Sequence, residues 1–328
     1  MSDAIKTAPD RTRDPASIED EEGDRTRLQE IRENPIVRSF LKSPVAIGSA
    51  SVVLLMMLSA AFAPWIAPHN PFDLATLDLM DGFSHPMVPN EVTGKTFWLG
   101  SDDQGRDVFS AILYGLRISL FVGIVAVFFA VVLGVSLGLL AGWRGGWLDA
   151  FIMRVADVQL SFPSILIALL IFGIARGFIP ATEREAAAMW VLIIAIGLSD
   201  WVQYARTVRA IVTTEKRKEY VLAARAIGCG PWRIALVHIL PNTMSSILVI
   251  GTMGLALAII AEATLSFLGV GVPPTQPSLG TLIRVGQGFL FSGEWWILLF
   301  PALTLLILAL SVNLLGDWLR DALNPKLR

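Results

Sequence analysis

Charge, histidine and cysteine are all scarce in this sequence, and each scarcity removes a class of function. Charged residues make up 16% of the 328-residue chain, whereas a soluble domain carries roughly 25%. The single cysteine, Cys229, excludes an internal disulfide and a cysteine-built zinc site, and we expect it to be a small filler. The three histidines show no metal-binding spacing. A net charge of −2 without a large basic block gives no indication of nucleic-acid binding.

Long uncharged apolar runs dominate instead, in a chain that is 54% hydrophobic. About 20 apolar residues are enough to cross a lipid bilayer. We therefore predict an all-α integral membrane protein with about six transmembrane helices. The predicted spans cover residues 44–66, 118–143, 151–174, 187–204, 244–267 and 295–315.

The remaining segments suggest how the chain is organised. Residues 1–34 are polar and cannot bury enough apolar surface to fold, so we expect a disordered tail. We assign residues 35–116 to an N-terminal segment with the first span and a long loop. The main transmembrane domain follows at 117–316, and a short tail occupies 317–328.

The distribution of basic residues predicts the orientation. Six spans put both termini on the same side of the membrane. Most of the 26 Lys and Arg residues lie in the N-terminal tail, the loop after the second span, the stretch 216–242 and the C-terminus. Because cytoplasmic loops are enriched in Lys and Arg, we predict that these segments are cytoplasmic and that the long loop faces outward.

Several polar residues near the spans have structural interpretations. Ser101 followed by Gln104 matches a capping box, which predicts a helix start at Ser101. We interpret the neighbouring acids as helix-start residues rather than cation ligands; they are Asp102, Asp103 and Asp107.

Charged residues inside the spans also receive structural interpretations. Arg154 and Asp157, one turn apart, predict a local ion pair. Asp200 and Glu262 each lie toward the end of a predicted span without an accompanying His or Lys. We therefore favour structural hydrogen bonds over proton transport for both acids.

The stretch 216–242, KRKEYVLAARAIGCGPWRIALVHILPN, interrupts the apolar pattern. It predicts two short helices with a break between them. Gly228 stands where the first helix would end, because glycine tolerates the left-handed conformation at little cost. Pro231 suits the first turn of the next helix. Ala223 and Ala224 predict a small-residue face on the first helix, which favours a docking surface for another protein.

The residues alone leave several function classes open. We find no nucleophile with its base and no phosphate-binding loop, so an intramembrane enzyme is the least favoured. A secondary transporter would need buried charge networks or broken helices near the midplane, and neither is evident. A membrane scaffold that recruits a soluble partner without transporting anything stays an alternative.

Four stretches resemble one known family, the permease subunits of binding-protein-dependent ABC importers. The stretch 216–242 is similar to the family's EAA loop, with Leu222 in place of the usual Glu and His238 in place of the usual Ile. Its form resembles that of the dipeptide and oligopeptide branch. So do the stretches WLGSDDQGRDVFSAILYGLRISL, AEATLSFLGVGV and NLLGDWLRDALNP. The resemblance runs from about residue 35 to the end.

The resemblance implies the type I importer fold and a permease domain at 117–316, in a bacterial inner membrane. It implies four kinds of neighbour: a similar second permease subunit, two cytoplasmic ATPases, an extracytoplasmic solute-binding protein and the lipid bilayer. No cofactor is expected on this chain, because ATP and Mg²⁺ would bind to the ATPases. The cargo would be a di- or oligopeptide, glutathione, a nickel chelate or an opine-like solute. The residues expected to couple to an ATPase are Glu219, Tyr220, Ala223, Ala224, Arg225, Gly228, Pro231 and Pro241.

Overall fold

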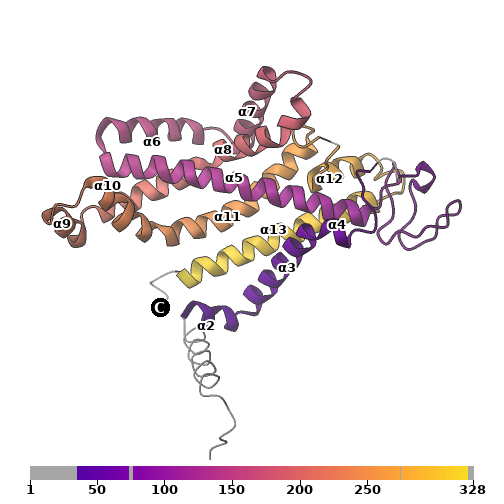
Figure 1. The fold of residues 1–328 in the computed structure, drawn as a ribbon, viewed down its shortest axis with the longest axis horizontal. Coiled ribbons are helices and arrows are strands. Elements are labelled where there is room, and N and C mark those ends of the chain that lie inside the picture. The colour runs from indigo at the N-terminus through magenta and orange to yellow at the C-terminus, as the bar shows by residue number, and fades with distance from the viewer. Residues whose placement is uncertain (1–34, 74–76, 274, 324–328) are drawn as a thin grey trace, which may run out of the picture.

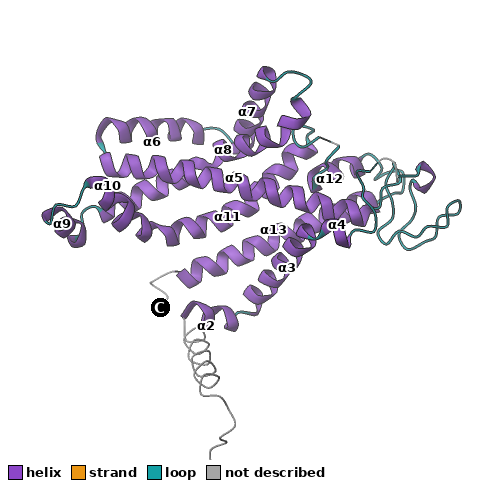
Figure 2. Cartoon of the chain, viewed as in Figure 1, coloured by secondary structure: helices purple, strands orange, loops and turns teal. Residues whose placement is uncertain are grey.

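The computed structural model describes residues 35–73, 77–273 and 275–323, and helices account for every regular element in these ranges (Figures 1 and 2). The predicted disordered tail, 1–34, lies outside the described residues. Within the described ranges, five helical segments are long and apolar enough to cross a membrane. They are α3 (Pro44–Ala61), α5 (Val108–Arg144), α8 (Arg184–Glu215), the run Pro231–Phe267 that ends in α11 (Leu240–Phe267), and α13 (Trp296–Leu323).

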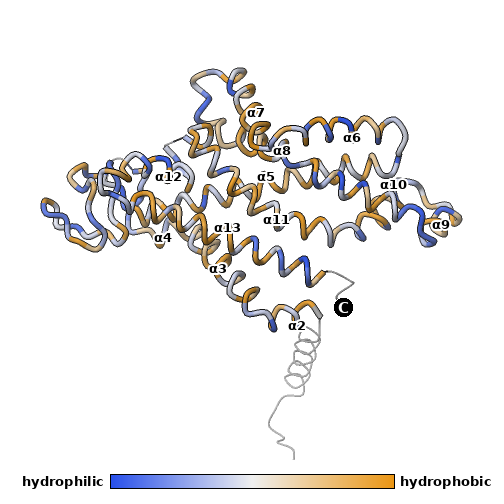
Figure 3. The backbone as a smooth tube through the Cα atoms, turned by 180° about the vertical axis from the view of Figure 1, so that it is seen from behind, coloured by the Kyte–Doolittle hydropathy of each residue, from blue (hydrophilic) through white to orange (hydrophobic). Residues whose placement is uncertain are grey.

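Shorter helices connect and flank these spans. They are α2 (Pro35–Lys42), α4 (Ala63–Ile66), the 3₁₀ turn η1 (Leu79–Asp81), α6 (Gly146–Leu160), α7 (Ser164–Phe178), α9 (Glu219–Ala226), α10 (Pro231–Arg233), the π-helical segment η2 (Ile234–Ile239) and α12 (Leu279–Gln287). Apolar residues follow the middle of the bundle, and hydrophilic ones gather at its two ends (Figure 3). The all-helical membrane architecture predicted from the sequence is thereby confirmed.

The predicted third span, 151–174, is broken in the structure. Its residues belong to two helices, α6 and α7, which meet at an angle of 99°. Pro163 explains the break, because a proline disfavours helical geometry at the preceding residue, here Phe162. The prediction of one continuous helix is wrong at this position.

The most extensive contact between two helices of the described chain joins α5 and α8. Three glycines one turn apart on α5 face the backbone of α8 and let the two helices approach closely. A Cβ atom on Gly138, for example, would lie 2.4 Å from the carbonyl oxygen of Ala205. The other two are Gly134 and Gly142. Small residues at this spacing are typical of close helix packing in membranes.

Glu262 of α11 has the structural role predicted for it. Its side chain is fully buried and accepts hydrogen bonds from the hydroxyls of Ser119 and Ser266, both at 2.7 Å. The Ser119 hydroxyl in turn accepts from the backbone N–H of Leu279 at 3.2 Å. The carboxylate therefore joins α5, α11 and the start of α12.

Two predictions about charges in the helices need correction. Asp200 lies at the middle of α8 rather than toward its end, because this helix continues eleven residues past the predicted limit of 204. The Asp157 carboxylate lies 3.8 Å from Arg206 of α8, so its ion pair joins two helices instead of forming with Arg154.

The predicted helix start at Ser101 is also wrong. Helix α5 begins at Val108, and Asp107 caps it by accepting from the N–H of Ser110 at 2.9 Å. Ser101 is instead buried in the long loop, where its hydroxyl accepts from the N–H of Ser84 at 2.8 Å. Asp102 pairs with Arg106 at 2.6 Å within a tight turn. The wrong start arose because an Asx-type turn and a capping box place polar residues at similar spacing.

Candidate functional site: the loop between α8 and α11

Helix α9 ends as the sequence predicts. Gly228 adopts a φ of +84°, the left-handed conformation that favours glycine. The N–H of Gly228 donates to the carbonyl of Arg225, and the N–H of Cys229 donates to that of Ala224, both at 3.0 Å. These two bonds form a Schellman motif. At the other end of α9, Glu219 lies in the first turn, where its negative charge interacts favourably with the helix dipole.

The second predicted helix is not a separate element. Pro231 does open a helical turn, but the chain passes through η2 directly into α11. Pro241 accounts for the π-helical turns, because it has no N–H to donate and its ring crowds the carbonyl four residues earlier. Residues from 231 onward therefore form one bent, continuous rod with the span, to which α9 is attached by the Gly228 turn.

A hydrogen-bonded cluster fixes α9 to the helices on both sides. The Glu215 carboxylate, at the end of α8, accepts from Lys218 Nζ at 2.6 Å and from the Tyr220 hydroxyl at 2.7 Å. Asn242 of α11 donates to the same Tyr220 oxygen at 3.1 Å. We call Glu215, Tyr220 and Asn242 the brace. The bond to Glu215 raises the pKa of Lys218, and burial, followed by the same carboxylate, raises the pKa of Tyr220, so both keep their protons at neutral pH.

Two further contacts join the loop to the end of α5. The Arg225 guanidinium lies 5.2 Å from the ring centre of Trp143, a cation–π distance. Lys216 Nζ donates to the carbonyl oxygen of Gly142 at 2.8 Å. Helix α9 is therefore held from three spans: α5, α8 and α11.

The two alanines do not share one exposed face, so that prediction is wrong. Ala224 is 7% exposed and packs with Val221 against the chain's own residues, whereas Ala223 is exposed. Several apolar residues of the loop are exposed, beside the exposed Arg225 and Arg233. We call four of these apolar residues the outer patch: Leu222, Ala223, Ile227 and Trp232, of which Ile227 is 80% exposed.

Sequence reasoning identified the loop but missed the brace and part of the outer patch. Glu215 lay just before the matched motif, so nothing in the pattern indicated its role. Trp232 stands between Pro231 and Arg233, so the sequence pattern did not indicate an apolar surface there. Val221 and Ala224 are three positions apart and lie on the buried face of α9. This helical spacing could have indicated which face of the helix is exposed.

Comparisons with known proteins identify the class. Residues 134–328 match the model of the family described as "Binding-protein-dependent transport system inner membrane component". Residues 35–86 match that of the "N-terminal TM domain of oligopeptide transport permease C". The first match covers more than half of the chain, so the protein belongs to the family of binding-protein-dependent inner membrane transport components.

Individual relatives agree over most of their length. The dipeptide transport system permease protein DppC of Escherichia coli is 40% identical over 289 residues, which are 88% of this chain and 91% of the relative. The di/tripeptide permease DppC of Pseudomonas aeruginosa is 36% identical over 89% of this chain and 91% of its own. The glutathione permease GsiD of Shigella flexneri is 39% identical over 89% of both.

Among solved structures, the inward-facing MetNI methionine ABC transporter is similar at a TM-score of 0.49 and 20% identity, over 66% of this chain and 97% of the other. By family, the chain is a multi-pass inner membrane permease subunit of an ABC importer, and the ATPase is a separate partner.

Proposed function

We propose that this permease carries small peptides and that the loop 216–242 transmits the work of a cytoplasmic ATPase to the spans. The peptide cargo is supported by relatives named for dipeptides, di/tripeptides and glutathione at 36–40% identity. The coupling role is supported chiefly by one observation: the outer patch is exposed on a loop whose helix α9 contacts three spans.

The assembly that follows has this chain paired with a second permease subunit across the translocation pathway. Two ATPases bind to the cytoplasmic ends of the pair, and a solute-binding protein delivers cargo from outside. Both termini and α9 are then cytoplasmic, in keeping with the distribution of Lys and Arg. The outer patch enters a cleft in one ATPase. The other residues expected to couple to the ATPase lie in the same loop: Glu219, Tyr220, Ala224, Arg225, Gly228, Pro231 and Pro241.

The mechanism is mechanical. When the ATPases close on ATP, α9 moves with the cleft that holds it. Because the brace connects α9 to both α8 and α11, the two spans move together rather than the loop bending alone. Rigid-body movement of packed helices is a common way to convert a local shift into a global change of state.

The test substitutes the outer patch and measures assembly and transport. The complete transporter is reconstituted with Ile227→Asp or Trp232→Ala, and ATPase retention and ATP-driven uptake of dialanine and glutathione are measured. We expect both variants to lose ATPase contact and uptake, because each removes exposed apolar surface from the docking face. Trp147→Ala is the matched control, since Trp147 of α6 is 77% exposed but lies outside the loop.

Three results would contradict the proposal. Normal uptake by both variants would remove the coupling role. Wild-type uptake that persists without ATP and collapses with the proton gradient would indicate a secondary transporter. Absence of any peptide uptake despite intact ATPase binding would indicate a scaffold.

A further inference from the structure

A second feature lies at the end of the bundle away from α9. Four segments surround a cavity of about 170 Å³: the end of α7, the start of α8, the loop after α11, and α12. On the same scale one water molecule needs about 10–15 Å³, so the cavity is much larger than a single water site. The cavity and α9 lie at opposite ends of α8, because Arg184 at the start of that helix lines the cavity and α9 follows its last residue.

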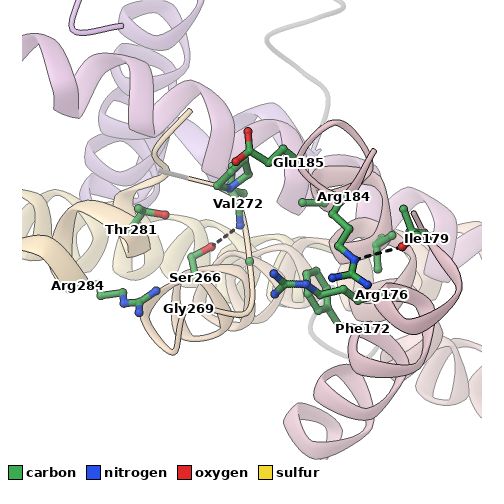
Figure 4. Close-up of a pocket in the computed structure, with 14 residues that line it drawn as sticks. Phe172, Arg176, Ile179, Arg184, Glu185, Ser266, Gly269, Val272, Thr281 and Arg284 are labelled. Atoms are coloured by element: carbon green, nitrogen blue, oxygen red, sulfur yellow. Dashed lines mark hydrogen bonds between the residues drawn. The ribbon is translucent and has the colours of Figure 1, made fainter. Parts of the chain in front are cut away.

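Three guanidinium groups surround the cavity, and Figure 4 shows their side chains around one space. They belong to Arg176, Arg184 and Arg284. Within the described part of the chain, no carboxylate lies within 4.0 Å of any of them. Arg184 Nε donates to the carbonyl of Ile179 at 3.1 Å. The single acid in the lining is Glu185, so the cavity carries a net positive charge.

The backbone leaves space for one of these groups. Gly269, in the loop after α11, has a φ of +79°, and a Cβ atom there would lie 2.2 Å from Nη1 of Arg284. The guanidinium therefore lies directly over a residue without a side chain. The two hydroxyl groups in the lining already have partners outside it, since Ser266 donates to Glu262 and Thr281 contacts Ser278. The guanidinium groups, in contrast, still have donors to offer.

The floor also has an apolar side. Phe172 and Val272 line the cavity and are 4% and 5% exposed. A suitable ligand therefore presents a carboxylate next to a small apolar group. Guanidinium groups bind carboxylates with paired, charge-assisted hydrogen bonds. The C-terminal residue of a small peptide combines these two features.

We propose that the cavity between α7, α8 and α12 binds the terminal carboxylate of the transported peptide. The inference rests on the proposed peptide cargo and adds a binding site on this subunit to it. Arg176, Arg184 and Arg284 bind the carboxylate, and Phe172 with Val272 contacts the side chain beside it. Such a site would hold the peptide by its carboxylate end whatever its sequence.

Chemical protection tests binding directly. The complete transporter, purified in detergent without the solute-binding protein, is treated with phenylglyoxal, which modifies accessible guanidinium groups, and modified sites are read by mass spectrometry. We expect dialanine to slow modification of the cavity arginines, and dialanine amide, which has no carboxylate, to leave it unchanged. Arg117, an exposed arginine of α5 outside the cavity, is the internal control.

Transport provides the second measurement. We expect Arg284→Gln to raise the KM for dialanine uptake about tenfold, because a hydrogen bond to a charged group is lost. Gly269→Ala, which displaces the guanidinium without removing its charge, has the same expected direction. Arg117→Gln is expected to match the wild type.

Any of the following results would contradict the proposed carboxylate site. Equal modification with and without dialanine excludes peptide binding there. If phosphatidylglycerol in nanodiscs protects the arginines and dialanine adds no further protection, the cavity binds lipid. Protection that requires the solute-binding protein assigns it to an acidic side chain of that protein. Peptide uptake by the wild-type transporter separates the two proposals. If the wild type takes up dialanine and the cavity variants do so equally well, only the cavity inference fails. If the wild type takes up no peptide, the proposed peptide function itself fails.

Discussion

At the scale of single residues, Gly228 determines where α9 points. Its conformation costs an L-amino acid with a side chain about 1–2 kcal/mol. Yet, among the described residues other than its two neighbours, no heavy atom lies within 4 Å of where a Cβ would stand. The requirement is therefore conformational rather than steric. Gly230, two residues later, has an ordinary φ of −63° and the same open surroundings, which makes it a matched control.

We expect Gly228→Ala to lower the number of peptides taken up per ATP hydrolysed, because the end of α9 frays and no longer transmits movement. Gly228→Asn should be milder, since asparagine tolerates the left-handed conformation better than alanine. Gly230→Ala should resemble the wild type. Uptake and ATP hydrolysis measured together on the reconstituted transporter check this, and an unchanged ratio in Gly228→Ala would contradict it.

At the scale of elements, the contact between α5 and α8 depends on the absence of side chains. A Cβ on Gly138 would meet backbone atoms of Ala205 at 2.4–3.0 Å, which cannot move as the tip of a flexible side chain can. The spacing Gly134, Gly138, Gly142 is visible in the sequence. The prediction of spans from apolar runs did not reveal this packing, because a glycine within an apolar run does not change the length of the run.

We expect Gly138→Ala to destabilise the helix pair by about 1–3 kcal/mol, the usual cost of overpacking, and to lower the thermal midpoint of the purified complex. Gly251→Ala in α11 is the control, because its Cβ would meet nothing within 4 Å. The control should be neutral or stabilising by up to about 1 kcal/mol, since alanine is the better helix former. Equal midpoints for the two variants would show that the helices can separate freely.

At the scale of the whole molecule, the sequence predicted what depends on composition and local chemistry. The spans followed from the length of apolar runs, and the end of α9 followed from Gly228. Features that depend on tertiary partners were not predictable. The pairing of Asp157 with Arg206 needs the packing of α6 on α8, and the brace needs Glu215 and Asn242, which are 27 positions apart, to meet around Tyr220. The break at Pro163 was visible in the sequence, but the apolar run around it favoured one span.

The brace affects the whole transporter, because it connects α9 to the two spans α8 and α11. We expect Glu215→Ala and Tyr220→Phe each to reduce uptake while ATP hydrolysis continues, because α9 then moves without α8 and α11. Since both substitutions break the same hydrogen bond, the double variant should be less impaired than the sum of the two, with a coupling energy of about 1 kcal/mol. Lys218→Met is the control, because Lys218 contacts the same carboxylate from solvent and exposed ion pairs contribute little. Additive losses from Glu215→Ala and Tyr220→Phe would show that the two residues act separately, and that the loop is driven through α10 and α11 alone.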